Sequence, residues 1–160
     1  MREGDTIVAL SSGALPSGVA VIRMSGPRVP ELLAKHVGGV PEARRLTFMR
    51  IGAESALDSG LVAYFPAPRS FTGEACAELQ VHGSPAGVRA ILRALTEEDG
   101  VRLAQAGEFT RRAFENGKLD LTAVEGLGDL IEAETENQRR QALARYEGAL
   151  SRRIDAWREA

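Results

Sequence analysis

The sequence predicts an α+β protein, with a mixed-sheet N-terminal domain over residues 1–118 and a long amphipathic helical segment over residues 119–160. Before residue 119, short apolar and β-branched runs alternate with helical patterns, and glycine, serine and proline separate them. The charge composition then changes. Residues 120–136 contain six acidic residues and no basic ones, whereas residues 137–160 contain six arginines and three acidic residues. This change sets the predicted domain boundary.

The N-terminal domain is expected to contain strands and helices. The predicted strands cover Thr6–Leu10, Gly18–Met24, Arg45–Gly52, Leu61–Phe65, Ala75–Val81 and Val101–Ala104. Gly26-Pro27 is predicted to open a helix that ends near His36, because proline is favoured in a first helical turn. A second helix is predicted to follow Ser84-Pro85 and to run to about Leu95.

Lys118 is predicted to lie at a turn between two helices. Asn116-Gly117 is typical of a helix end, since both residues tolerate the left-handed conformation found there. Asp120 is the expected N-cap of the next helix, although Thr122–Glu125 offers an alternative capping box two residues later.

The segment after residue 119 has the spacing of an amphipathic helix. Its apolar residues recur mostly at steps of three or four, at Leu121, Val124, Leu127, Ile131, Ala142, Tyr146, Leu150, Ile154 and Trp157. The apolar pattern is interrupted around Thr135–Gln141, so one long helix and two consecutive helices both fit. Either arrangement needs a packing partner for the apolar stripe, because a lone helix is marginal in water.

Composition excludes several classes of protein. The net charge of −2 and the isoelectric point near 5.8 argue against a generally basic nucleic-acid-binding surface. Cys76 is the only cysteine, so neither an intramolecular disulfide nor a cysteine-built metal site is expected, and with only two histidines no catalytic zinc site is predicted. The charged N-terminus lacks a long apolar run, so no signal peptide or membrane span is predicted and a cytoplasmic location is expected.

Residues 75–82 alternate between an apolar face and a face that carries Cys76, Glu78, Gln80 and His82. This second face could be the solvent side of an antiparallel strand or the lining of a cleft. In a cleft, Glu78 could accept two parallel N–H bonds from a flat heterocycle or a guanidinium group. Burial as a small apolar residue is the favoured role for Cys76, and a structural hydrogen bond is favoured for His82.

Arg23 and Lys118 are the two cations that could meet a ligand. Arg23 shares one face of its predicted strand with Val19 and Val21, where it could be solvated or reach an anionic group. Lys118 on its own pattern could equally be a surface lysine.

Gly117-Lys118 superficially suggests a phosphate-binding loop, but the motif fails at both ends. Arg112 stands where the first glycine is needed, and Leu119 stands where serine or threonine should follow the lysine. No GTPase activity is therefore expected of this sequence alone, and no catalytic residue set is predicted.

Four ordered segments, which cover nearly the whole chain, read DTIVAL, GVAVIRMSG, RSFTGEACAELQVHG and GEFTRRAFENGKLDLTAVEGLGDLIEAET. Together they resemble the MnmE/TrmE family of tRNA-modification GTPases. The resemblance implies a tetrahydrofolate-binding, homodimer-forming α+β domain followed by the beginning of a helical domain. It also implies a folate site made by Arg23, Glu78 and Lys118, with 5-formyl- or 5,10-methylene-tetrahydrofolate as the cofactor.

The whole enzymes of this family modify C5 of tRNA wobble uridines together with an FAD-dependent partner of the MnmG/GidA type. Their GTPase domain, which uses GTP, Mg²⁺ and K⁺, and their C-terminal cysteine motif have no counterpart in this sequence. Two local departures concern the loop Gly13–Gly18, which is poorer in glycine than is usual, and Ser84, which stands where glycine is common.

Two other functions are compatible with the residues. The first is a folate-dependent one-carbon transferase related to the aminomethyltransferase of glycine cleavage, whose folate domain is similar. The second is a non-catalytic helical interaction module with a vestigial folate site. The ENGKLDL junction favours the MnmE-like assignment over the first, and the presence of all three predicted site residues argues against the second.

Overall fold

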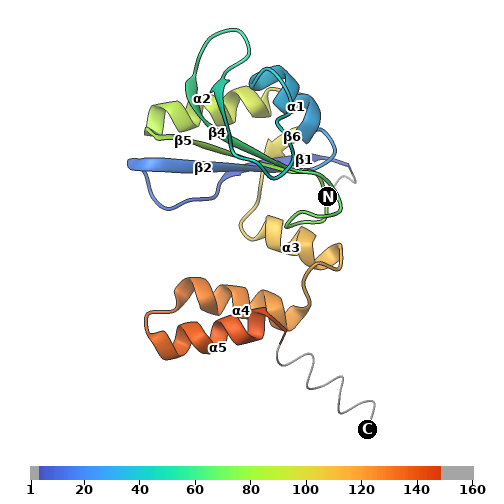
Figure 1. Cartoon of the computed structure of the whole chain (residues 1–160), viewed down its shortest axis with the longest axis vertical. Helices are drawn as coiled ribbons and strands as arrows, with labels where there is room; N and C mark the ends of the chain where they lie inside the picture. The colour runs from blue at the N-terminus through green and yellow to red at the C-terminus, as the bar shows by residue number, and fades with distance from the viewer. Residues whose placement is uncertain (1–3, 149–160) are drawn as a thin grey trace. The chain divides into compact units, whose positions relative to one another are not determined.

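The computed structural model describes residues 4–148, and the chain divides into two compact units, Met1–Phe109 and Thr110–Ala160. The first unit has the mixed α+β architecture that the sequence predicts (Figure 1). These units are defined by internal packing, and the predicted domain boundary between residues 118 and 119 stays a prediction.

One six-stranded sheet forms the body of the first unit. Its strands are β1 (Thr6–Leu10), β2 (Ser17–Ser25), β3 (Thr47–Ile51), β4 (Asp58–Phe65), β5 (Cys76–Gly83) and β6 (Val101–Leu103). They lie in the order β3-β4-β5-β2-β1-β6. Every neighbouring pair is antiparallel except β1 and β6, which are parallel, so the sheet is mixed.

Helices α1 (Val29–His36) and α2 (Pro85–Thr96) cover one face of this sheet (Figure 1). The core lies between these helices and the sheet, because alternate strand residues point toward them. In β2 and β5, the fully buried side chains on this face include Ala20, Ile22, Met24, Ala77 and Leu79. The opposite face of the sheet, which carries Arg23 and Glu78, is covered by neither of these helices.

The second helix begins where the sequence predicts, but the first begins later. The Ser84 hydroxyl accepts a hydrogen bond from the amide of Gly87, so it caps α2. Gly26-Pro27 does not open α1, which starts at Val29. Gly26 has φ +140°, and a Cβ there would lie 2.6 Å from the Thr6 Cα, so Gly26-Pro27 forms a close turn against β1.

Strand β4 begins at Asp58, three residues before the predicted start at Leu61. Its first residues include Gly60, which lies outside the predicted strand. A Cβ at Gly60 would lie 2.0 Å from the Gln80 carbonyl oxygen. The glycine is thus needed for close contact between β4 and β5, which the local sequence pattern does not reveal.

The helix junction near Lys118 confirms the local predictions. Helix α3 (Glu108–Glu115) ends in a Schellman arrangement, in which Gly117 has φ +67° and the Lys118 amide donates to the Ala113 carbonyl at 2.8 Å. Asp120 then caps α4 by accepting a hydrogen bond from the Ala123 amide at 2.7 Å.

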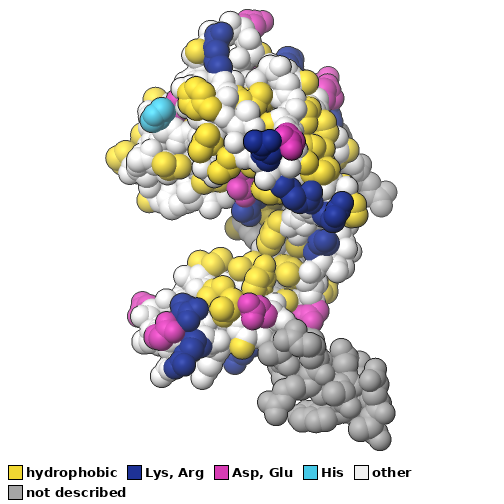
Figure 2. Space-filling model, in the orientation of Figure 1, with side chains coloured by type: hydrophobic (Ala, Val, Ile, Leu, Met, Phe, Trp, Pro, Cys, Tyr) yellow, Lys and Arg dark blue, Asp and Glu magenta, His cyan; other side chains and the backbone are white. Residues whose placement is uncertain are grey.

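Two helices follow this junction, α4 (Leu121–Glu132) and α5 (Glu136–Tyr146), rather than one long helix. Thr135 explains why a new helix begins here, because it forms a capping box with Gln138 at the start of α5. The two helices pack against each other, and apolar side chains form a row along α4 (Figure 2). The predicted continuation of the apolar pattern through Leu150, Ile154 and Trp157 lies outside the described residues.

Within residues 4–148, none of the helices combines the length and the apolar character that crossing a membrane requires.

Candidate functional site

Arg23 and Glu78 form an ion pair on the sheet face that α1 and α2 leave uncovered. The two residues are directly opposite each other in the antiparallel pairing of β2 with β5. Arg23 Nε and Nη2 both donate to Glu78 Oε1, at 3.0 and 2.8 Å. The side chains are 29% and 24% exposed, so the pair is partly shielded but open to a ligand.

The pair leaves one carboxylate oxygen and one guanidinium nitrogen without a hydrogen bond. Both hydrogen bonds end on Glu78 Oε1, so among the described residues Glu78 Oε2 and Arg23 Nη1 form no hydrogen bond. A carboxylate oxygen accepts and a guanidinium nitrogen donates. The site therefore presents an acceptor on Glu78 and donors on Arg23, and the ion pair holds both side chains in place.

Aromatic rings enclose the arginine of this pair. The Arg23 Cζ lies 5.3 Å from the centroid of the Phe71 ring and 5.7 Å from that of Phe109. At these distances the guanidinium is attracted to the face of each ring. A cavity of about 100 Å³ next to the pair is lined by Arg23, Phe65, Phe71, Cys76 and Glu78.

The sequence interpretation missed these phenylalanines. Phe65 ends β4 and is paired in register with Cys76, so the alternation that places Cys76 and Glu78 on one face of β5 could have identified it. Phe71 and Phe109 lie outside the strands, and no periodic pattern connects them with Arg23.

A second ion-pair cluster holds the start of α3, next to Phe109. Arg102 donates to both carboxylate oxygens of Glu108, at 2.8 and 2.5 Å, and to Asp5 at 2.6 Å. The Glu108 side chain is completely buried. The hydrogen bond to Glu108 is the main cause that raises the pKa of Arg102, burial opposes it, and Asp5 adds to it, so the guanidinium stays charged.

Lys118 belongs to the second compact unit. It is exposed in the turn between α3 and α4, where its amide completes the helix end described above. The structure thus brings Arg23 and Glu78 together within the first unit and places Lys118 in the other one.

Cys76 and His82 take the structural roles that the sequence favours. Cys76 is a buried free thiol, with Thr72 Oγ1 at 3.1 Å from its sulfur. The ring of His82 forms a hydrogen bond with Asp58 at 2.8 Å, and the His82 amide donates to the same carboxylate at 2.9 Å. Burial raises the pKa of Asp58, but these hydrogen bonds and one from Ser59 outweigh it and leave the pKa below its ordinary value.

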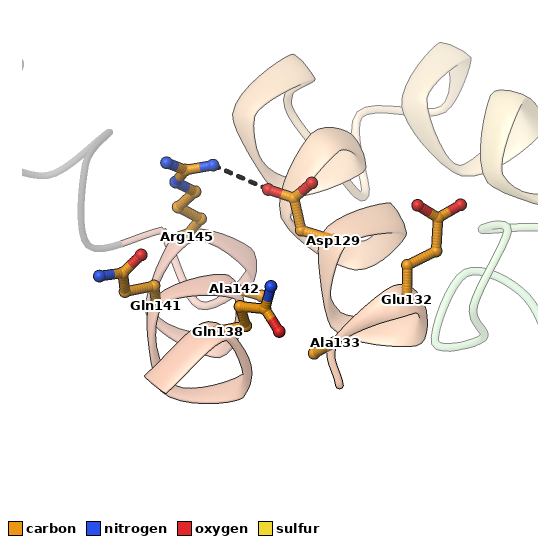
Figure 3. Close-up of a pocket in the computed structure, with 7 residues that line it drawn as sticks. All are labelled: Asp129, Glu132, Ala133, Gln138, Gln141, Ala142 and Arg145. Atoms are coloured by element: carbon orange, nitrogen blue, oxygen red, sulfur yellow. Dashed lines mark hydrogen bonds and ion pairs between the residues drawn. The ribbon is translucent and has the colours of Figure 1, made fainter. Parts of the chain in front are cut away.

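Another cavity, of about 300 Å³, lies between α4 and α5 (Figure 3). Two of its three charged groups pair with each other, since Arg145 donates to Asp129 at 2.7 Å across the two helices, and Glu132 is the third. The cavity contains no aromatic wall, and both partners of the ion pair are about half exposed. It resembles a surface groove of a helix pair more than a ligand site.

None of the residues that the structure describes form a cluster of three or more histidine, cysteine, aspartate or glutamate side chains suited to a metal ion.

Comparison with known proteins agrees with the resemblance noted in the sequence. The family model described as "GTP-binding protein TrmE N-terminus" matches residues 6–118. The chain is 58% identical over 157 residues to the tRNA modification GTPase MnmE of Rhizobium johnstonii, covering 97% of the chain and 36% of that relative. It is 56% identical over 161 residues to the MnmE protein of Azorhizobium caulinodans, covering 99% of the chain and 37% of the relative.

The chain thus spans little more than a third of the length of the curated relatives it matches. The family match includes all six strands of the sheet, both helices that cover it and the predicted contact residues Arg23, Glu78 and Lys118. On the extent of this match, the chain belongs to the TrmE N-terminus family and corresponds to part of a tRNA modification GTPase of the MnmE type.

Proposed function

We propose that this chain is the folate-binding, dimer-forming front part of an MnmE-like GTPase. The observation that carries the proposal is the Arg23–Glu78 pair, which offers one open carboxylate oxygen and one open guanidinium nitrogen beside phenylalanine rings. A flat, polar heterocycle with an N–H next to a carbonyl group complements this arrangement.

The pterin ring of a tetrahydrofolate, such as 5-formyl- or 5,10-methylene-tetrahydrofolate, has such an edge. Glu78 Oε2 would accept from the ring N–H, and Arg23 Nη1 would donate to the neighbouring carbonyl oxygen. Arg23 and Glu78 would then bind the same end of the ligand. Lys118 stays a proposed contact on the resemblance alone, and its ammonium group suits the carboxylates of the folate tail.

The size of the cavity limits what one chain can enclose. Its volume of about 100 Å³ is well below the roughly 300–1,000 Å³ of sites that bury a drug-sized ligand. Only one end of a folate would fit, so the rest of the ligand needs further walls. A second copy of the chain is the proposed source of these walls.

Exposed apolar side chains on the same sheet face support the homodimer. Phe48 of β3 is 71% exposed and its partner Leu61 of β4 is 36% exposed, and both lie on the face that carries Arg23 and Glu78. Apolar side chains exposed to this extent on one sheet face favour contact with another protein surface.

The remaining roles belong to the whole protein and extend the proposal. The relatives are named tRNA modification GTPases, so we infer that the complete protein hydrolyses GTP with Mg²⁺ and K⁺ and contributes to modifying C5 of wobble uridines. An FAD-dependent protein of the MnmG/GidA type, tRNA and a cytoplasmic location complete this proposed setting. The residues of this chain supply no GTP-binding loop, because Arg112 and Leu119 occupy two of its required positions.

Isothermal titration calorimetry with 5-formyl-tetrahydrofolate tests the folate site. The wild-type chain should bind, and Glu78→Ala should weaken binding at least tenfold, because a hydrogen bond to a charged group contributes about 1.5–3 kcal/mol. Glu54→Ala removes a glutamate outside the cavity and serves as the matched control, with unchanged affinity. Absence of binding by the wild-type chain, or equal binding by Glu78→Ala, would contradict the assignment.

A further inference from the structure

The connection between β4 and β5, residues 66–75, carries Phe71 to the guanidinium of Arg23. We refer to these ten residues as the strap. Phe71 is the one strap residue that lines the cavity, so the position of the strap decides where this wall of the pocket stands. The next residue, Thr72, is completely buried.

Thr72 is the centre of a hydrogen-bonded chain that joins the strap to the sheet. Its hydroxyl lies 2.7 Å from the Ser25 hydroxyl of β2 and 3.1 Å from the Cys76 sulfur of β5. Ser25, also completely buried, donates to Glu74 Oε2 at 2.6 Å. The Glu74 amide in turn donates to Thr72 at 3.2 Å.

The donor and the acceptor of each hydrogen bond in this network can be assigned in only one way. A hydroxyl group has a single hydrogen, and the hydrogen of Ser25 is committed to the carboxylate of Glu74. Thr72 must therefore donate to Ser25, and Cys76 must donate its thiol hydrogen to Thr72. Thr72, like Ser25, both accepts and donates, so an apolar side chain of the same shape in its place leaves the buried Cys76 thiol without this acceptor.

The strap has other contacts at other points along it, including a hydrogen bond from the Arg44 side chain to the Arg69 carbonyl. The Ser70 hydroxyl bonds to the Glu74 carbonyl at 2.5 Å and accepts from the Gly73 amide at 3.0 Å, which closes a turn within the strap. The Gly26 amide donates to the Ala75 carbonyl at 3.0 Å, but only at the strap's end. Thr72, directly after Phe71, holds the middle of the strap against two strands.

From this geometry, we propose that Thr72 is the positioning residue of the pocket. Its hydrogen bonds to Ser25 and Cys76 hold the neighbouring Phe71 ring against the Arg23 guanidinium. The inference about geometry stands on the described contacts, and its effect on ligand affinity rests on the proposed folate function. Phe71 then acts as a fixed wall, and the open nitrogen of Arg23 keeps its direction toward a ligand.

Nuclear magnetic resonance of the Arg23 side chain tests the positioning without any ligand. A nearby phenyl ring displaces the Arg23 Nε–H resonance, and Phe71→Ala gives the reference position without that ring. Thr72→Val should move the resonance toward this reference, whereas Thr72→Ser, which keeps the hydroxyl, should leave it at the wild-type position. A wild-type position in Thr72→Val, or an equal displacement in both variants, overturns the proposal.

Ser25→Ala interrupts the same chain at the next link and must reproduce the effect of Thr72→Val. It also decides the question if Thr72→Val fails to fold, which the backbone resonance of Leu79 in the core would report. A Ser25→Ala protein with the wild-type Arg23 resonance overturns the proposal.

Affinity for 5-formyl-tetrahydrofolate adds a second readout. Thr72→Val should bind about tenfold more weakly than the wild type, as expected for the loss of one buried hydrogen bond, and Thr72→Ser should bind like the wild type. If the wild-type chain does not bind the folate, the proposed function fails, while the Arg23 resonance still decides the role of Thr72. If the resonance moves but the affinity does not, Phe71 is not a ligand wall and the inference is wrong at that step.

Discussion

At the scale of single residues, burial separates the ion pairs that stabilise this protein from those that remain available for ligands. Arg23 and Glu78 are each about a quarter exposed and face each other across two strands. Partly exposed pairs contribute little to the free energy of unfolding. The hydrogen bonds between Arg23 and Glu78 fix the directions of a donor group and an acceptor group, which matters more for ligand binding than for folding.

The Arg102–Glu108 pair should contribute more to the free energy of unfolding than to ligand binding, because the Glu108 side chain has no exposed surface. Arg102→Met should lower the free energy of unfolding by about 2–3 kcal/mol, at or just below the low end for broken buried pairs, because Arg102 is itself 35% exposed. Urea unfolding measures this. Arg45→Met, which breaks a pair with Glu42 that is about 70% exposed on both sides, should change stability by roughly 0.5 kcal/mol or less. Equal effects of the two variants would contradict this account.

Asp58 makes stability depend on pH. Although burial raises the pKa of this carboxyl, hydrogen bonds from the His82 ring, Ser59 and the His82 amide leave it below its ordinary value. A lowered pKa means that the ionised group stabilises the fold fully above its unfolded-state pKa of about 4 and that this contribution disappears as the pH falls through the lower folded-state value.

Asp58→Asn should therefore unfold more easily than the wild type near neutral pH. The difference between the two proteins should narrow as the pH drops below about 4. Urea unfolding at a series of pH values measures both curves. A difference that stays constant with pH would show that the carboxylate charge has no part in the stabilisation.

At the scale of elements, a single glycine determines how closely α4 and α5 pack. A Cβ at Gly126 would lie 2.6 Å from the Tyr146 nitrogen and 3.1 Å from the Ala142 carbonyl oxygen. These are backbone atoms, which cannot move aside without separating the helices. Gly126→Ala should therefore destabilise the helix pair by about 1–3 kcal/mol.

Gly128→Ala, two residues further along α4, is the matched control. Apart from the chain neighbours of Gly128 and the nearby backbone of α4, no atom of the described residues lies within 4 Å of a Cβ at this position, so alanine should instead stabilise the helix by up to about 1 kcal/mol. Thermal unfolding followed by far-ultraviolet circular dichroism compares the two variants. A loss of stability in both would mean that the close contact at Gly126 is not the cause.

The elements also show which parts of the fold depend on local sequence. Ser84, Gly117 and Asp120 act within three to five residues along the chain, and the structure confirms their caps. Gly26-Pro27 misled the prediction of α1, because the turn there is made against β1, far away in sequence. The prediction of β4 also began too late, and Gly60, which it left out, makes its close contact with Gln80 of β5.

At the scale of the whole molecule, the proposed homodimer can be measured directly. Sedimentation equilibrium should give twice the chain mass. Phe48→Asp, which places a charge on the exposed sheet face, should shift the equilibrium toward monomer, because an interface cannot bury an unpaired carboxylate cheaply. Val40→Asp introduces the same charge at another exposed apolar position and should leave the dimer intact. A strictly monomeric wild-type chain would contradict the dimer and the proposed source of the missing pocket walls.

The sequence by itself determined the α+β class, most strand and helix positions, the capped junction around Lys118 and the family to which the chain belongs. These features depend on periodicity, on caps a few residues long and on ordered motifs, all of which can be read along the chain. Only the tertiary structure decided that Arg23 bonds to Glu78, 55 positions away, and that Phe71 lies on its guanidinium. Strand register and the path of a ten-residue connection depend on packing between distant segments, and no local pattern records them.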